Sequence, residues 1–406
     1  MNIPSLEIVL PSNSSLDKIL SAKNLSPFGV PQLEFAAALA KALTVKVSPK
    51  IRNFPELVSL GFWLRPSNLK RMIDTFSTRQ SNLIHLPRGL VFHVAPSNVD
   101  TIFVYSWLIS LLCGNRNLVR LSSKETPQTS MLLSILKELL QQPAWNEIAE
   151  RTLIMRYSHD SEISSALSAA CDLRVIWGGD ETIKAFRAFP LNPRATELAF
   201  ANKFSLSVLD AYVVATAEER VINKLASDFH NDVYWYGQMA CSSPQMLLWR
   251  GSASDTESAA NRFWLALQAE LNNRDVRVTP ADHMNKEVMA DALAIERVAE
   301  RIMTPDSRIT RIWMYEPKLL DNLHCGAGFF HEARIHSLKN LVSLLSRKVQ
   351  TISYFGVAAN EWKEFIINEI PMGIDRLVPI GQALDFGPIW DGFDLLLAFQ
   401  RQLSLK

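Results

Sequence analysis

Cysteine and glycine are both scarce in this 406-residue sequence. It has four cysteines and 15 glycines, so its glycine content is well below the roughly 7% usual in proteins. The cysteines are far apart and form no CxxC pair, which excludes a dense disulfide framework and the common zinc patterns. We therefore expect a reduced protein with no bound metal; its cysteines are Cys113, Cys171, Cys241 and Cys325.

Net charge and long apolar runs are also lacking. The 42 basic and 41 acidic side chains nearly cancel, which argues against a nucleic-acid partner bound by phosphate neutralisation. The longest apolar stretch, from Thr101 to Cys113, is too short for a bilayer, which needs about 20 residues. The first residues show no basic segment followed by an apolar one, so we expect no signal peptide. These features predict a cytoplasmic protein without a membrane span.

From residue 83 onward, apolar strand patterns alternate with helical ones. Helices of about 10 to 15 residues that separate buried strands are typical of a doubly wound parallel sheet. A second series of strands and helices begins near Phe204. The sequence therefore predicts an α/β fold with two α/β domains; the first four strands are expected at 90–95, 117–121, 152–155 and 173–177.

The standard phosphate-binding motifs, GxGxxG and GxxxxGK[ST], are absent. The nearest substitute is Gly178-Gly179, which lies between a predicted strand and a predicted helix. Backbone N–H groups at such a helix start can face a phosphate. The same residues are also compatible with an ordinary strand–turn–helix corner.

Cys241 has small and polar neighbours in the segment GQMACSSP, whereas core cysteines usually have bulky apolar ones. A nucleophilic thiol and an inert buried thiol are both compatible with this pattern. His230 precedes it closely enough to suggest a Cys–His acyltransferase or hydrolase. A second group of histidines and cysteine matches no common zinc spacing; it comprises His324, Cys325, His331 and His336.

Five segments in the same order resemble the LuxC-type acyl-CoA reductase branch of the aldehyde dehydrogenase superfamily. The resemblance covers roughly residues 83 to 400 and implies an aldehyde-dehydrogenase-like fold. It rests on the segments at 89–99 (GLVFHVAPSNV), 113–123 (CGNRNLVRLSS), 177–181 (WGGDE), 237–245 (GQMACSSPQ), and 378–381 with 390–394 (VPIG and WDGFD).

The resemblance implies roles for two catalytic residues. The Cys241 thiolate attacks an activated acyl group and forms an S-acyl enzyme. The side-chain amide of Asn98 and the backbone N–H of Cys241 share the oxyanion. A reduced nicotinamide then delivers hydride, and an aldehyde leaves.

Cofactor residues follow from the same resemblance. Arg120 stands where the superfamily usually has lysine, and with Ser122, Ser123 and Lys124 it forms a basic, hydroxyl-rich loop suited to a ribose 2′-phosphate. This favours NADPH over NADH. The resemblance also places Gly178 and Gly179 at the nucleotide, and Glu332 at the nicotinamide ribose.

One departure from the superfamily bears on the direction of the reaction. The superfamily's ELGGK segment aligns with Ala199 to Lys203, so Ala199 replaces the general-base glutamate. A reductase is better without this base because hydrolysis would waste the acyl enzyme. A shift of two residues in the alignment would instead place Glu197 at this position.

The predicted organisation has four parts: a helical segment packed on the cofactor domain (1–82), an NADP-binding domain (83–205), a catalytic domain (206–370), and a returning segment (371–406). The predicted function is NADPH-dependent reduction of an activated acyl group to an aldehyde. We expect acyl-CoA or an acylated protein as donor, an acyl-protein synthetase as partner, and a homo-oligomer. Two rivals remain: a cysteine acyltransferase or thioesterase using His230, and a non-catalytic acyl-binding subunit.

Overall fold

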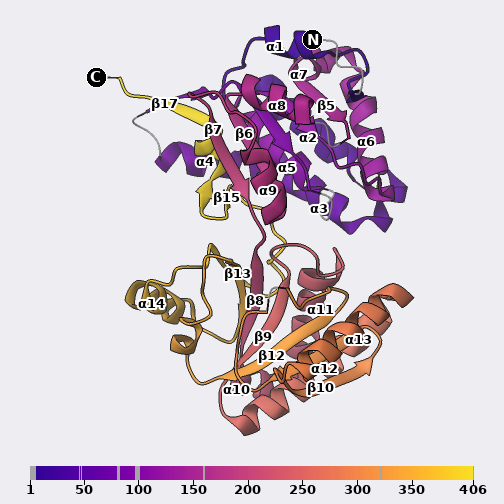
Figure 1. Ribbon diagram of the computed structural model, residues 1–406, viewed down its shortest axis with the longest axis vertical. Helices are drawn as coiled ribbons and strands as arrows, with labels where there is room; N and C mark the ends of the chain where they lie inside the picture. Colours follow the sequence, from indigo (N-terminus) through magenta and orange to yellow (C-terminus); the bar gives the residue numbers. More distant parts are fainter. Residues whose placement is uncertain are drawn as a thin grey trace. The chain divides into compact units, whose positions relative to one another are not determined.

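The computed structural model describes residues 6–44, 46, 48–79, 83–96, 101–158, 161–320 and 322–405. The chain divides into two compact units. Unit 1 comprises residues 1–202 and 386–406, and unit 2 comprises residues 203–385. The yellow C-terminal strands therefore lie among the indigo and purple elements of unit 1 (Figure 1).

The core of unit 1 is a six-stranded sheet with β4 and β3 at its middle. All neighbouring strands are parallel except the edge strand β1, which is antiparallel to β5. In spatial order the strands are β1 (Glu7–Leu10), β5 (Thr152–Arg156), β4 (Arg116–Arg120), β3 (Leu90–Val94), β6 (Leu173–Trp177) and β7 (Thr196–Phe200).

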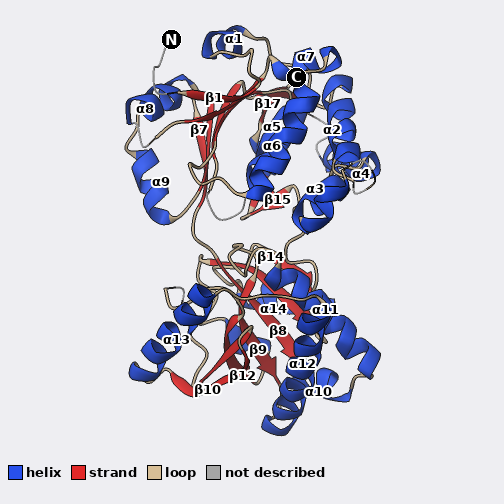
Figure 2. Ribbon diagram, turned by 90° about the vertical axis from the view of Figure 1, so that its right-hand side faces the viewer, coloured by secondary structure: helices blue, strands red, loops and turns tan. Residues whose placement is uncertain are grey.

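Helices cover both faces of this sheet (Figure 2). One face packs on α1 (Leu16–Ser21), α8 (Ser161–Ala170) and α9 (Asp180–Arg187). The other face is covered by α5 (Ile102–Leu112); every residue of this helix is buried, and accordingly none of them is charged. Further helices extend that layer: α2 (Val30–Ala42), α3 (Pro55–Trp63), α4 (Pro66–Arg79), α6 (Pro127–Leu140) and α7 (Asn146–Ala149).

The segment after residue 385 completes the core of unit 1. Phe386, Trp390 and Phe399 are buried in the cluster that contains α5. Strand β17 (Gln400–Leu403) pairs with β2 (Ile84–Pro87), and β15 (Ile389–Trp390) pairs with β16 (Phe393–Asp394), which leads into α15 (Leu395–Ala398).

Unit 2 is built on a seven-stranded sheet. It is parallel except at one edge, where β10 runs antiparallel to β11. In spatial order the strands are β10 (Ala299–Asp306), β11 (Ile309–Met314), β12 (Phe329–Ile335), β9 (Pro244–Arg250), β8 (Phe204–Asp210), β13 (Val349–Phe355) and β14 (Arg376–Pro379). One face packs on α10 (Ala211–Thr216), α11 (Glu219–Tyr234) and α12 (Ala253–Asn273), and the other on α13 (Pro280–Ile295) and α14 (Ala359–Glu369).

The unit boundaries differ from those that the sequence predicted. The chain leaves unit 1 after Asn202 rather than after residue 205, because β8 already begins at Phe204. Residues 371–385 remain in unit 2, because β14 extends its sheet beside β13. Residues 6–79 pack on unit 1: the apolar side chains of α1 lie on one face of its sheet, and those of α2, α3 and α4 lie in the core around α5.

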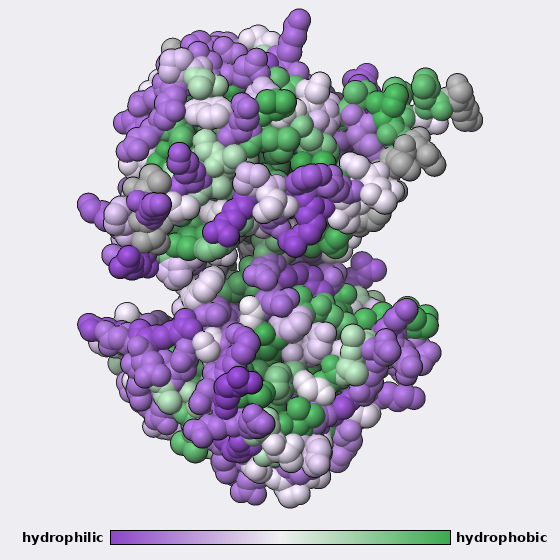
Figure 3. Space-filling view, turned by 180° about the vertical axis from the view of Figure 1, so that it is seen from behind, coloured by the Kyte–Doolittle hydropathy of each residue, from purple (hydrophilic) through white to green (hydrophobic). Residues whose placement is uncertain are grey.

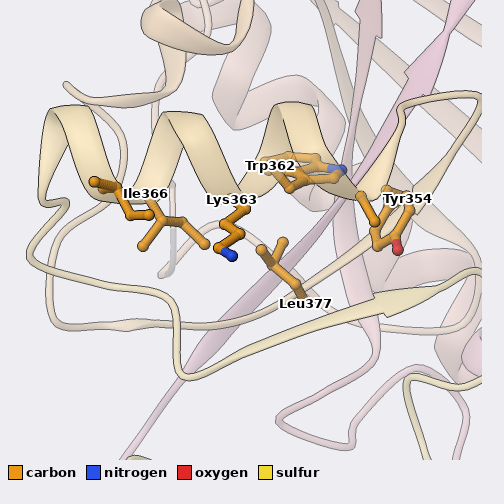
Figure 4. Close-up of a pocket in the computed structure, with 7 residues that line it drawn as sticks. Tyr354, Trp362, Lys363, Ile366 and Leu377 are labelled. Atoms are coloured by element: carbon orange, nitrogen blue, oxygen red, sulfur yellow. The ribbon is translucent and has the colours of Figure 1, made fainter.

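Hydrophilic side chains are interspersed with smaller apolar areas on the visible face of each unit (Figure 3). No helix in the described part of the chain is long and apolar enough to cross a membrane. Unit 2 carries an open groove of about 450 Å³ between α14 and strands β13 and β14, where Lys363 extends towards Leu377 (Figure 4). None of the predicted site residues lines this groove.

Candidate active site

Most of the predicted cofactor residues meet at one edge of the sheet in unit 1. Strands β3, β4 and β6 are mutually parallel, so their carboxyl ends share an edge. The strand order switches sides at β3: β4 and β5 follow on one side of it, and then β6 and β7 on the other. Such a switch point is where open α/β sheets bind ligands. Asn98 follows β3 but lies outside the described residues.

Arg120 is the last residue of β4, and its side chain is half-buried. Its guanidinium carbon lies 4.9 Å from the ring centre of Tyr157 and 6.0 Å from that of Phe186. The Nε atom is buried without a hydrogen-bond partner. Since a buried donor without a partner is costly, this guanidinium is suited to receiving an anionic ligand.

The next residues continue this edge as a polar loop. Ser122 is half-buried, and its hydroxyl accepts the backbone N–H of Lys124 at 3.2 Å. Ser123 and Lys124 are exposed. The loop therefore offers hydroxyl groups and a cation beside Arg120, a combination that fits a phosphorylated ribose.

Gly178 and Gly179 form the turn between β6 and α9. Gly179 is the N-cap residue of α9, and the side chain of Asn202 approaches it so closely that a Cβ there would lie 3.3 Å from Oδ1. The N-terminal N–H groups of α9 point out of this edge and are suited to a phosphate. The residues present thus fit a dinucleotide.

Glu332 does not fit the role predicted for it. It lies on β12 in unit 2 and has no exposed surface. Its Oε1 accepts the indole N–H groups of Trp249 and Trp264, and its Oε2 accepts Arg311 Nε at 2.6 Å. Both oxygens are engaged inside the core, which favours a structural role for Glu332 over the predicted contact with the ribose.

Cys241 lies in a tight turn between α11 and β9, and its side chain is half-buried. Gly237 and Gln238 both have positive φ values, 56° and 66°, and so reverse the chain. The fully buried Gln238 amide donates to the carbonyls of Pro244 and Phe329, both at 3.0 Å. The turn is therefore fixed on both sides of the cysteine.

A serine fixes the cysteine's own backbone. The buried Ser205 hydroxyl, at the start of β8, donates to the Cys241 carbonyl at 2.7 Å and accepts the Thr351 N–H at 3.2 Å. The sequence does not point to Ser205, because one serine in an apolar strand carries no signal. The two residues that it contacts, Cys241 and Thr351, lie 36 and 146 positions further along the chain.

The remaining cysteines lie in environments that suppress thiolate formation. Burial raises the pKa of Cys171 to about 12 and that of Cys325 to about 11, and it raises the pKa of Cys113 further. Because the thiolate is the nucleophile, these three are poor nucleophiles at neutral pH.

His230 is a weak candidate for a catalytic base. Its ring stacks on Tyr234 of the same helix, and Nδ1 lies 3.4 Å from Asn231 Oδ1. Burial, with the neighbouring Arg274 charge, lowers its pKa to about 4. The acyltransferase reading, which needs His230 as base, gains no support from this environment.

Glu197 and Ala199 lie on β7, the edge strand of unit 1. The Glu197 carboxylate accepts Arg174 Nη2 at 2.6 Å and Arg187 Nε at 2.8 Å. Both oxygens of this carboxylate are therefore occupied by guanidinium groups, which leaves it poorly placed to bind and orient a water. The alternative alignment, with Glu197 as general base, is therefore disfavoured.

The fold of the chain is that of the aldehyde dehydrogenases, which confirms the predicted fold class. A Staphylococcus aureus AldH superposes with a TM-score of 0.59 at 13% identity, covering 91% of this chain and 88% of that one. Lactaldehyde dehydrogenase from Escherichia coli gives 0.61 at 12% identity over 93% and 87%. An oxidoreductase from Marinobacter aquaeolei gives 0.63 at 9% identity over 96% and 88%.

Within that fold class, the chain belongs to the acyl-CoA reductase (LuxC) family, whose model matches residues 68–306, more than half of the chain. A long-chain acyl-protein thioester reductase of Aliivibrio fischeri is 29% identical over 197 residues, 47% of this chain. Its counterpart in Photorhabdus luminescens is 26% identical over 207 residues, 50% of this chain. The matched part spans 39% of the length of each relative.

Proposed function

We propose that this protein reduces a long-chain acyl thioester to an aldehyde with NADPH, through an S-acyl intermediate on Cys241. The observation that carries the proposal is the rigid turn that presents a half-buried thiol at the amino end of β9. The family match and the relatives named as acyl-protein thioester reductases support the reaction class. The donor is acyl-CoA or an acylated protein.

The chain's own residues account for the covalent steps. The Cys241 thiolate attacks the thioester carbonyl, the C–S bond to the donor breaks, and the donor leaves as a thiol after taking a proton. The Cys241 N–H, in a turn fixed by Gln238 and Ser205, would stabilise the oxyanion, and the family resemblance assigns the same role to the Asn98 amide. Once the acyl carbon has been reduced, the resulting tetrahedral alkoxide collapses: the C–S bond to Cys241 breaks, the thiolate is regenerated and the aldehyde is released.

Unit 1 supplies the cofactor site. Arg120, Ser122, Ser123 and Lys124 would hold the 2′-phosphate of the adenosine ribose, and the turn at Gly178-Gly179 would hold the pyrophosphate. When bound, NADPH supplies the two-electron hydride equivalent that reduces the acyl carbon. With Ala199 in place of the general base, the acyl enzyme is protected from hydrolysis.

The decisive experiment follows absorbance at 340 nm with NADPH and a series of acyl-CoAs and acylated carrier proteins. Wild type and the thiol control Cys171→Ala, which removes a buried cysteine of unit 1, should consume NADPH only when an acyl donor is present. Cys241→Ala should not. If Cys241→Ala keeps its activity, the proposed intermediate is wrong; release of free CoA without NADPH loss would favour the acyltransferase.

A further inference from the structure

A lysine without solvent exposure lies in unit 2, outside every residue assigned above. Lys286 is on α13, and its ammonium group donates to the backbone carbonyls of Ser307 and of Ala327, the latter at 3.0 Å. Burial lowers the pKa of this lysine. Among the described residues it makes no ion pair, although burying a charge is costly without a partner. A buried cation that costs stability in this way indicates a specific role for Lys286.

Ala327 belongs to a loop whose backbone is unusual. Gly326, Ala327 and Gly328 have consecutive positive φ values of 74°, 53° and 80°. Alanine in this left-handed region is strained and persists only where its surroundings enforce it. The hydrogen bond from Lys286 to the Ala327 carbonyl is one such constraint.

The other face of the same loop holds the cysteine turn. The Ala327 N–H donates to the Gly237 carbonyl at 2.9 Å. The N–H groups of Gly328 and Phe329 both donate to Gln238 Oε1, at 2.9 and 3.1 Å. A continuous series of hydrogen bonds therefore joins Lys286 to the two residues that reverse the chain before Cys241.

We infer that Lys286 is a positioning residue for Cys241, acting through the loop at 326–328 and through Gln238. Its fixed charge holds the loop in its left-handed conformation, and the loop holds the turn that aims the thiol. The catalytic consequence rests on the proposed function, since it assumes that Cys241 accepts the acyl group. The hydrogen-bonded link between Lys286 and the turn does not depend on the proposed function.

The test compares Lys286→Met with Arg262→Met. Arg262 is also a unit 2 cation that donates to backbone carbonyls, those of Val214, Ala215 and Ala217, but it contacts neither the loop nor the cysteine turn. Arg262→Met therefore controls for a general loss of stability. The measurement is the single-turnover rate of Cys241 acylation by acyl-CoA without NADPH, at a temperature where circular dichroism shows both variants folded.

Lys286→Met should slow acylation about tenfold or more, because small displacements of a reacting group have large effects on rate. NADPH affinity should be unchanged, and Arg262→Met should acylate within about twofold of wild type. Equal losses in both variants, or none in Lys286→Met, would overturn the inference. A wild type that is never acylated would instead sink the proposed function.

A second variant protects the test if Lys286→Met does not fold. His324 braces the same loop from within: its Nδ1 accepts the Gly326 N–H at 3.3 Å and its Nε2 donates to the Phe329 carbonyl at 2.9 Å. His324→Leu should therefore slow acylation in the same way, while the hydrogen bonds of Lys286 to the backbone carbonyls remain in place. Normal acylation in a folded His324→Leu protein would contradict the role of the loop.

Discussion

One carboxylate in each unit is held by several donors at once: Glu332 is fully buried and Glu197 is largely buried. Glu332 accepts two indole N–H groups and a guanidinium, and Glu197 accepts two guanidinium groups. In each case the negative charge is balanced where water is largely excluded. A residue fixed in this way contributes to stability, and removing its charge leaves a buried cation unpaired.

Glu332→Gln should therefore destabilise the protein by about 3–5 kcal/mol, the usual effect of breaking a buried ion pair. Urea unfolding gives the free energy, and fluorescence titration gives the affinity for NADPH, which should not change. Weaker NADPH binding by a variant of normal stability would restore Glu332 to the cofactor site.

Arg120→Ala should weaken NADPH binding more than NADH binding, because only NADPH carries the 2′-phosphate. A charged hydrogen bond contributes about 1.5–3 kcal/mol, so the KM for NADPH should rise roughly tenfold to a hundredfold. The exposed Arg194 of unit 1 offers a matched control for the loss of one positive charge. An equal effect on both cofactors would place Arg120 elsewhere than at the 2′-phosphate.

At the scale of elements, one polar network ties the middle of the unit 1 sheet to α5. His93 on β3 contacts Ser106 Oγ on α5 at 2.8 Å and Asn117 Oδ1 on β4 at 3.0 Å. Ser106 also accepts the indole N–H of Trp177, the last residue of β6. The three strands whose ends form the candidate cofactor edge are thus joined through one buried imidazole.

This network predicts acid sensitivity of unit 1. Burial lowers the His93 pKa from 6.5 to about 4. Between these values the unfolded chain binds a proton that the native state does not, so stability is full above pH 6.5 and falls as the pH decreases. The loss is about 1.4 kcal/mol per pH unit and about 3 kcal/mol by pH 4.

Urea unfolding of unit 1, measured from pH 7 to pH 4, checks this expectation. The variant His93→Gln keeps a donor and an acceptor but cannot titrate. In this variant, the free energy of unfolding should lose the part of its pH dependence that His93 contributes. A pH dependence that is the same in both proteins would assign the acid sensitivity to other groups.

The sequence alone predicts helices and strands better than it predicts which side chains contact one another. The buried strands β3, β4 and β6 are short apolar runs, and Cys241 lies in a motif, so both could be found by inspection. Ser205 and Lys286 act through contacts with residues 21 to 146 positions away, which no local pattern records. The boundary at 385 was missed because β14 is short and half-exposed.

At the scale of the whole molecule, two units with separate cores share one chain. Near both points where the chain passes from one unit to the other, it is held by an ion pair or hydrogen bonds within unit 2. Lys203 pairs with Asp375 at 2.9 Å, and Asp232 accepts the N–H groups of Gly381 and Ala383 at 2.7 and 2.9 Å. Separate cores predict that unfolding is not a single two-state transition.

NADPH should accordingly stabilise unit 1 in preference to unit 2. A ligand present at one hundred times its Kd stabilises the state that binds it by about 2.7 kcal/mol. Hydrogen exchange followed by mass spectrometry resolves the two units by peptide. Slower exchange with NADPH is expected in peptides of β3, β4 and β6, and protection confined to unit 2 would refute the assignment of the cofactor site.

The return of the chain to unit 1 has a consequence for biosynthesis. Phe386, Trp390 and Phe399 are synthesised after all of unit 2, yet they fill the core around α5. On the ribosome, unit 2 can therefore reach its final packing while the earlier-made residues of unit 1 still expose apolar surface. Of the two units, the one whose synthesis starts earlier is completed later, and in that interval its uncovered apolar surface is prone to aggregation.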